Sequence, residues 1–200
     1  MKKILFALFI FTYALGFSQI DKLNSKEPLV KDPYFKKETN VAVQPGQKVR
    51  FIHSDLFERK PDMYGGNPFF TGNVQFEHQG AMLTADRVIF YEKENFAKAI
   101  GNVLLVTSDG NRITSNEMEY DGNTQRGIAR GKVVLTDAKQ TISTDVLYYD
   151  RVKNTAYFNS GGTINDGRNT MWTQSATYFI DSKTNEFTNN YTIDNAQYRV

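Results

Sequence analysis

The sequence contains no cysteine and only two histidines, His53 and His78. Without cysteine the chain has no disulfides, no thiolate metal site and no residue that could carry a lipid anchor after a signal peptide. Neither histidine has a partner at a metal-ligand spacing. The serines lack the turn that frames a nucleophilic serine, and no glycine-rich loop opens a helix. These absences predict a protein that is not an enzyme and holds no metal or cofactor.

A basic surface stripe is also missing. The formal net charge is +2, but Lys2 and Lys3 account for both excess positive charges, and the other 22 basic side chains balance 22 acidic ones. Nucleic-acid binding requires a concentration of positive charge on one face. The sequence therefore predicts no nucleic-acid partner.

The N-terminus has the pattern of an export signal. Lys2 and Lys3 precede the apolar run 4–15, and small residues follow at Gly16 and Ser18. This run is too short to span a bilayer as a mature anchor, so we expect a signal peptide over residues 1–18. No later stretch is apolar enough to cross a membrane. Residues 19–46 are polar and contain three prolines, which predicts a loosely ordered leader before a domain over 47–200.

A unit of about thirty residues recurs through this domain. Its landmarks, spaced 29 or 30 residues apart, are Gly72, Gly101, Gly131 and Gly161; Leu83, Ile113, Ile142 and Trp172; and Phe90, Tyr120, Tyr149 and Phe179. Such a period is typical of stacked units that bury their apolar faces against one another. Period-2 runs, separated by glycine-rich turns, predict an all-β fold with essentially no helix after residue 46.

One polar position recurs between the apolar ones. Leu83 and Val88 have opposite parity, so both face inward only if a bulge or bend separates them. Asp86, Asn116 and Asp145 occupy this stretch, and short polar side chains suit such a corner. A row of carboxylates for catalysis or calcium is the less favoured interpretation. A glycan-binding protein or glycosidase would need paired carboxylates, which the single-file arrangement does not offer.

The predicted inward positions form the candidate binding set. They are Val74, Phe76, Leu83, Val88, Phe90, Val103, Leu105, Ile113, Met118, Tyr120, Val133, Leu135, Ile142, Leu147, Tyr149, Trp172 and Phe179. They either fill a closed core between two sheet layers or line an open trough that holds acyl chains. Periodicity does not separate the two, and packed interiors are the norm, so the pattern alone favours the closed core.

The repeat also resembles a known family. The motif Gly-Asn-Val-x-Phe-x-His-x-Gly at 72–80, the Leu-x-x-Asp and aromatic pair that follow, and the stretch 131–164 are similar to the OstA-like proteins of lipopolysaccharide transport, the LptA type. The resemblance covers roughly residues 47–200. It implies an open twisted β-jelly roll, or β-taco, whose trough would be lined by the inward set.

The resemblance implies a non-enzymatic periplasmic carrier that shields the acyl chains of lipid A. Its expected partners are lipopolysaccharide, other β-jelly-roll modules joined end to end, and a second copy through edge strands. The alternative is a structural module with a filled core that docks onto outer-membrane assembly partners. Thr163, Asn165 and Thr177 in the fourth repeat predict that the trough narrows or becomes polar near 161–178. A fifth repeat begins near Tyr191, so we expect the domain to continue past Val200 or to end on an uncapped strand.

Overall fold

The computed structural model describes residues 48–195, which belong to one compact unit of the chain, residues 39–200. The predicted signal peptide over 1–18 and leader over 19–46 lie outside the described residues. Within 48–195 the fold is built from strands, and the helical content is the 3-10 turn η2 (Tyr64–Gly66). The prediction of an all-β domain is confirmed.

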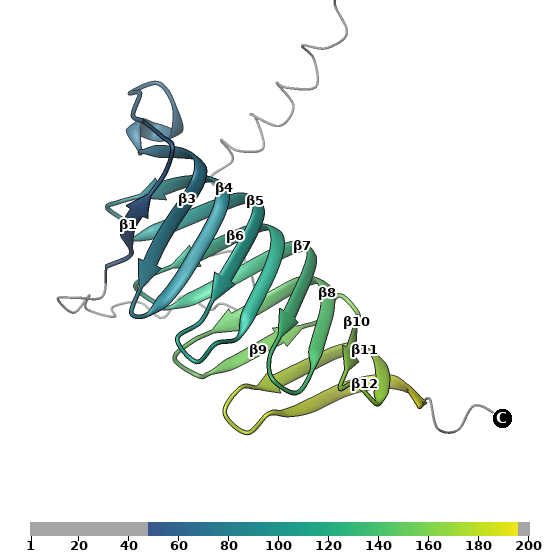
Figure 1. The fold of residues 1–200 in the computed structure, drawn as a ribbon. Helices are drawn as coiled ribbons and strands as arrows, with labels where there is room; N and C mark the ends of the chain where they lie inside the picture. The colour runs from purple at the N-terminus through teal and green to yellow at the C-terminus, as the bar shows by residue number, and fades with distance from the viewer. Residues whose placement is uncertain (1–47, 196–200) are drawn as a thin grey trace, which may run out of the picture. The chain divides into compact units, whose positions relative to one another are not determined.

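The strands follow one another as an antiparallel meander (Figure 1). Their bounds are β1 Arg50–His53, β2 Leu56–Glu58, β3 Phe69–His78, β4 Ala81–Tyr91, β5 Phe96–Val106, β6 Arg112–Asp121, β7 Arg126–Thr136, β8 Thr141–Asp150, β9 Thr155–Phe158, β10 Gly162–Asn165, β11 Asn169–Phe179 and β12 Thr184–Asn195. The sheet order runs from β1 through β3 to β8 and then through β10 and β11 to β12. Each hairpin therefore lies beside the next one along the chain.

The path between β8 and β11 is interrupted. Strands β9 and β10 each have four residues, and both pair with β8 on one side and β11 on the other. Residues 159–161 leave the sheet between them. Side chains bridge the gap, since Ser160 Oγ lies 2.9 Å from Thr144 Oγ1 and Gln174 Nε2 donates to the carbonyl of Asn159. The two short strands thus occupy the place of one long strand that is interrupted at residues 159–161.

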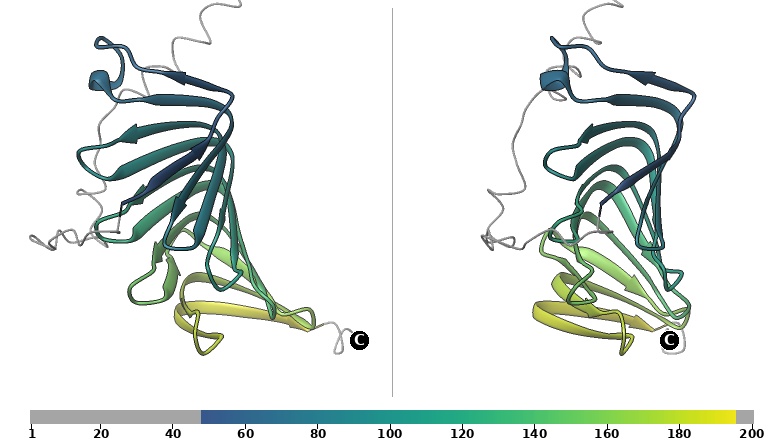
Figure 2. Two further views of the ribbon diagram at one scale, coloured as in Figure 1. Left: turned by 60° about the vertical axis from the view of Figure 1, so that its left-hand side comes forward. Right: turned by 90° about the vertical axis from the view of Figure 1, so that its left-hand side faces the viewer.

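The long strands bend near their middles, so the sheet doubles back into two layers (Figure 2). At each bend between β3 and β8 the pairing register shifts. In the alternate strands β3, β5 and β7 a glycine and the residue after it both have positive φ at the bend: 75° and 48° at Gly72 and Asn73, 78° and 45° at Gly101 and Asn102, 75° and 51° at Gly131 and Lys132. Two successive left-handed residues in mid-strand force the corner, and glycine tolerates that backbone best.

The polar corner positions behave as predicted. Asp86, Asn116 and Asp145 are exposed and lie where the register shifts. The Asp86 carboxylate accepts a 2.9 Å hydrogen bond from Asn102 Nδ2, next to Gly101 on the neighbouring strand. Among residues 48–195 no group of three acidic or histidine side chains is placed to hold a metal ion. Asp86 therefore stabilises the corner through its bond to Asn102, and Asn116 and Asp145 occupy the same corner position in their strands.

The bends explain how both halves of each strand face the same interior. In β6 the buried residues are Ile113 and Ser115 before the corner, and Met118 and Tyr120 after it. Two successive exposed residues at the corner, Asn116 and Glu117, switch the parity in β6, so both halves of this strand contribute side chains to one core. The same switch separates Leu83 from Val88 in β4. The predicted bulge between these two residues is confirmed.

The corner glycine can be tested by substitution. A Cβ on Gly101 would lie 2.4 Å from Asp86 Oδ2, whereas a Cβ on Gly110, which also has positive φ, would meet nothing within 4 Å. Alanine in left-handed backbone costs about 1–2 kcal/mol at either site. We expect Gly101→Ala to lower the free energy of unfolding by about 1 kcal/mol more than Gly110→Ala, because Asp86 must also give up its bond to Asn102. Equal costs in urea titrations would contradict this account of the corner.

Candidate functional site

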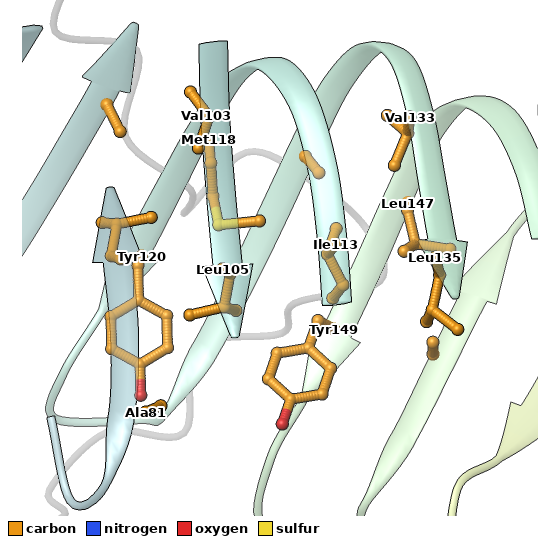
Figure 3. Close-up of a cluster of buried hydrophobic side chains, with 14 of the residues drawn as sticks. Ala81, Val103, Leu105, Ile113, Met118, Tyr120, Val133, Leu135, Leu147 and Tyr149 are labelled. Carbon is orange, nitrogen blue, oxygen red and sulfur yellow. The ribbon is translucent and has the colours of Figure 1, made fainter. Parts of the chain in front are cut away.

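The interior between the two layers is the candidate functional site. Of the predicted inward positions, Phe90 is partly buried and packs against the core. The others between β3 and β8 are 0–6 % exposed, and Figure 3 shows several of them converging between the strands. They are Val74, Phe76, Leu83, Val88, Val103, Leu105, Ile113, Met118, Tyr120, Val133, Leu135, Ile142, Leu147 and Tyr149. Their inward placement is as predicted, and their contact with lipid stays a prediction.

The prediction was wrong for Trp172 and Phe179, which are 43 % and 37 % exposed. The last repeat is one residue shorter than the spacing that selected them. Ile164 pairs with both Ile142 and Met171, so Met171 is the counterpart of Ile142. Continuing from there, the inward residues of β11 are Thr173, Ala176 and Tyr178, all nearly fully buried. Both members of the aromatic pair Tyr178-Phe179 fit a step of 29 or 30 residues from Tyr149, and Tyr178 is the one that faces inward.

The same shift corrects the expected polar section near 161–178. Asn165 is exposed and Thr163 and Thr177 are only partly buried, while their neighbours Ile164 and Tyr178 point inward. Thr173 is the polar inward residue here, as Ser115 and Thr144 are in the repeats before it, so the interior does not become more polar in this repeat.

Side-chain volume is redistributed within it. Phe158 is buried where the preceding repeats have Ala99 and Ala129, and Gly162 stands where they have Val103 and Val133. A Cβ on Gly162 would lie 2.8 Å from the Phe158 ring, so the ring takes the space that a valine would fill.

The hairpin turns form two rims, which meet where the layers come together opposite the bends. Rim 1 consists of the turns that follow β3, β5 and β7, at residues 79–80, 107–111 and 137–140. Rim 2 consists of the turns that follow β4, β6, β8 and β11, at residues 92–95, 122–125, 151–154 and 180–183. We call the line between the two rims the mouth of the interior.

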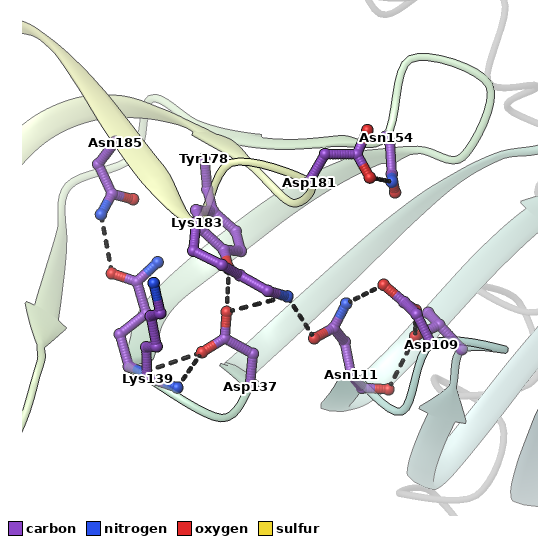
Figure 4. A network of polar contacts seen from close by, with 11 residues as sticks. Asp109, Asn111, Asp137, Lys139, Asn154, Tyr178, Asp181, Lys183 and Asn185 are labelled. Atoms are coloured by element: carbon purple, nitrogen blue, oxygen red, sulfur yellow. Dashed lines mark hydrogen bonds and ion pairs between the residues drawn. The ribbon is translucent and has the colours of Figure 1, made fainter.

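Polar contacts close the mouth from rim to rim (Figure 4). Lys183 Nζ lies 3.6 Å from Asp137 Oδ2 and 3.4 Å from Asn111 Oδ1, and the Tyr178 hydroxyl also donates to Asp137. Asn185 Nδ2 donates to Gln140 Oε1 at 2.8 Å.

At the other end of the mouth, Arg151 donates to the carbonyls of His78 at 3.1 Å and Gln79 at 2.7 Å. His78 Nδ1 lies 2.8 Å from the Tyr120 hydroxyl. These residues were missed by sequence reasoning, which considered His78 for a metal-ligand role and did not predict that its side chain is buried. The available signal was the near-constant offset of 42 and 41 residues that separates each tyrosine from its polar partner.

Within residues 48–195 the inward side chains form one packed cluster. A cavity of about 20 Å³ remains beside His78 and Tyr120, lined mainly by Val49, Ala81, Leu105 and Met118 among other residues. That is room for one water-sized molecule, not for an acyl chain. In this state the two layers are packed against each other, as the closed-core interpretation expects.

Burial controls the ionisation of the inward tyrosines. It raises the pKa of Tyr120 to about 12, and the nearby Arg151 guanidinium partly opposes the shift. Burial, followed by the charge of Asp109, raises the pKa of Tyr149 as well. Both phenols are therefore neutral hydrogen-bonding groups at ordinary pH.

The described residues contain no helix long and apolar enough to cross a membrane. A stack of antiparallel hairpins around an apolar interior defines the class of the protein as a β-jelly-roll module. The family of OstA-like proteins matches over residues 46–200, and the chain belongs to that family. Membership confirms both the resemblance found in the repeats and the prediction of a non-enzymatic protein.

Solved structures show the same fold. One of them is the crystal structure of LptH from Pseudomonas aeruginosa, described as the LptA-homologous periplasmic component of the conserved lipopolysaccharide transport device. The two chains are 16 % identical, with a TM-score of 0.50 over 58 % of this chain and 93 % of LptH. This structural likeness shows a shared fold. A comparison with curated protein sequences gives no significant match.

The corrected position of Trp172 is open to a direct test. Because its side chain is exposed, we expect Trp172→Ala to change the free energy of unfolding by less than about 1 kcal/mol. Ile142→Ala, at the buried position of the neighbouring repeat, should cost about 2–5 kcal/mol. Chemical denaturation followed by circular dichroism measures both. A cost for Trp172→Ala that matches Ile142→Ala would restore Trp172 to the interior.

The pKa of Tyr120 predicts how stability depends on alkaline pH. The phenol holds its proton more tightly in the folded state, so its contribution is complete below pH 10 and is lost as the pH rises from about 10 to about 12. We expect Tyr120→Phe to remove about 2–3 kcal/mol from the fall in unfolding free energy across that window. Urea titrations at pH 9 and at pH 11.5 compare the two proteins. An equally steep fall in both would contradict the assignment.

Proposed function

We propose that the protein is a non-enzymatic carrier of lipopolysaccharide transport that shields lipid A acyl chains between its two layers in the periplasm. Its OstA-like family and its fold, shared with a periplasmic transport component, support this proposal. The signal-like residues 1–18 fit export to that compartment. The carrier would present its apolar interior to acyl chains and leave the sugars in water.

The observation that carries the proposal is the continuity of the apolar interior from β3 to β11. Each repeat adds side chains of the same kind at the same depth, such as Leu105 and Leu135 on alternate strands. An acyl chain buried along this line gains about 0.8 kcal/mol for each methylene group. No charged clamp is needed, and successive modules of similar affinity could pass lipid along without chemistry.

The filled interior requires the layers to separate before lipid binds. No backbone ladder joins the two rims in the described pairing, and the contacts across the mouth are made by side chains. Opening would exchange side-chain contacts for acyl-chain contacts of similar chemistry. The filled core also favours the alternative function, a structural module that docks onto outer-membrane assembly partners.

Assembly with other modules would use the ends of the sheet. Strands β1 and β12 end the described order, so each has one edge that no strand within residues 48–195 pairs with. Strand addition supplies affinity through backbone hydrogen bonds. We propose end-to-end contact with other β-jelly-roll components, or with a second copy of this chain, through these edges.

Photo-crosslinking separates the two functions. A photoreactive residue in place of Phe90 or Tyr120 should capture lipopolysaccharide, because both rings face the interior. The same residue in place of Thr114 or Thr136, which are exposed neighbours of inward residues, should not. Folding of each variant is checked by circular dichroism. Two results would contradict the carrier function and favour the structural module. One is capture of lipopolysaccharide from the exposed positions alone, and the other is capture from none of the four positions in folded protein.

A further inference from the structure

The inward tyrosines recur as one position of the repeat. Tyr120, Tyr149 and Tyr178 are spaced by 29 residues, and all three are nearly fully buried. Each comes from the end of a strand that leads into rim 2. The ring belongs to the apolar interior, while the hydroxyl lies at the mouth, as Figure 3 shows for Tyr120 and Tyr149.

Their polar partners recur on rim 1 with the same step. Tyr120 contacts His78 at the start of the first rim-1 turn, and Tyr178 contacts Asp137 in the third. Tyr149 lies at the level of the second turn, where Asp109 influences its phenol. The repeat thus places one tyrosine rung at each of three successive levels of the mouth.

Two cations reinforce the outer rungs. Arg151 reaches from rim 2 to the carbonyls of His78 and Gln79 and also interacts with the Tyr120 hydroxyl. Lys183 reaches from rim 2 to Asp137, whose side chain is fully buried. A charged side chain therefore crosses from rim 2 to rim 1 at each end of the closed mouth, Arg151 at one end and Lys183 at the other.

The closed mouth is not fully satisfied. Next to the Lys183 contact, Gln140 Nε2 and Asn185 Oδ1 are buried without a hydrogen-bond partner. Unpaired buried polar atoms disfavour the state that buries them. By contrast, backbone hydrogen bonds join neighbouring turns along rim 2. The N–H groups of Gly122, Arg151 and Ile180 donate to the carbonyls of Asn95, Gln125 and Asn154, respectively. Backbone bonds therefore hold rim 2 together, whereas side-chain bonds hold it to rim 1.

We infer that the mouth is a lateral gate, in which the tyrosine hydroxyls, Arg151 and Lys183 hold the rims together and release them when an acyl chain passes sideways into the interior. This inference rests on the proposed carrier function and adds the route and its control. The amphipathic tyrosine suits both states, because its ring stays against apolar groups while its hydroxyl exchanges a rim-1 partner for water. Lipid would load along the whole mouth rather than by threading from one end.

The first test removes the hydroxyls and keeps the rings. The double variant Tyr120→Phe, Tyr178→Phe should load fluorescently labelled lipopolysaccharide faster than the wild type, by about two- to tenfold for each of the two hydrogen bonds lost. The amount bound at saturation should not change. Tyr91→Phe is the matched control, because this ring lies on the opposite face of β4 from Phe90 and contacts Phe96. Equal loading rates for the wild type and the double variant would contradict the gate.

The second test locks the rims and does not depend on the stability of the first variant. The natural chain has no cysteine, so Gln140→Cys with Asn185→Cys provides two thiols that a short reversible bifunctional thiol reagent can join across the mouth. The link should abolish loading, and a reductant should restore it. The control pair Thr124→Cys with Lys153→Cys joins two neighbouring turns of rim 2 and should load normally.

The outcomes distinguish the gate from the function beneath it. Loading at the native rate with the rims linked would overturn the gate while leaving the carrier intact. A wild-type protein that takes up no lipopolysaccharide would overturn the carrier, and the gate with it. Loading that stops with the rims linked, and proceeds with the rim 2 link, supports both.

Discussion

The two-layered structure depends on one local constraint, a corner in the middle of each long strand from β3 to β8. In β3, β5 and β7 two left-handed residues make the corner, and in β5 and β7 the buried side chains keep one parity on both sides of it. In β4, β6 and β8 the buried parity switches at the corner, because without that switch the two halves of the strand would present their apolar residues to opposite faces of the sheet. Both halves of the strand then supply one interior, and the recurrence of the corner stacks these interiors into a continuous apolar line.

The contacts that close the interior differ in kind from those that build it. Backbone ladders join neighbours along the stack, whereas side chains join the two layers at the mouth. Side-chain contacts of this kind are individually weak and exchangeable with water, while backbone ladders are cooperative. The fold therefore resists loss of a hairpin more strongly than separation of its rims. A carrier that must admit and release a bulky amphiphile needs this division.

Sequence reasoning reached the fold because the informative residues were periodic. The glycine step, the inward positions from Val74 to Tyr149 and the polar corner at Asp86 all follow from spacing and parity. It failed at Trp172 because one missing residue shifts parity, and an aromatic pair disguises the shift. It also missed Arg151, Lys183 and Asp137, because contacts between rims join turns that are distant in the chain and have no hydrophobic period.

The break between β9 and β10 gives the stack a mechanical weak point. Along β4 to β8 each hairpin is held to the next by ladders that run through both layers, but at the break two short ladders, of four and three residue pairs, and a few side-chain bonds near Ser160 share that task. Tension applied along the stack, as when a neighbouring module is pulled away from the C-terminal end, would concentrate there. The hairpin of β11 and β12 would part first, and the repeats before it would stay folded.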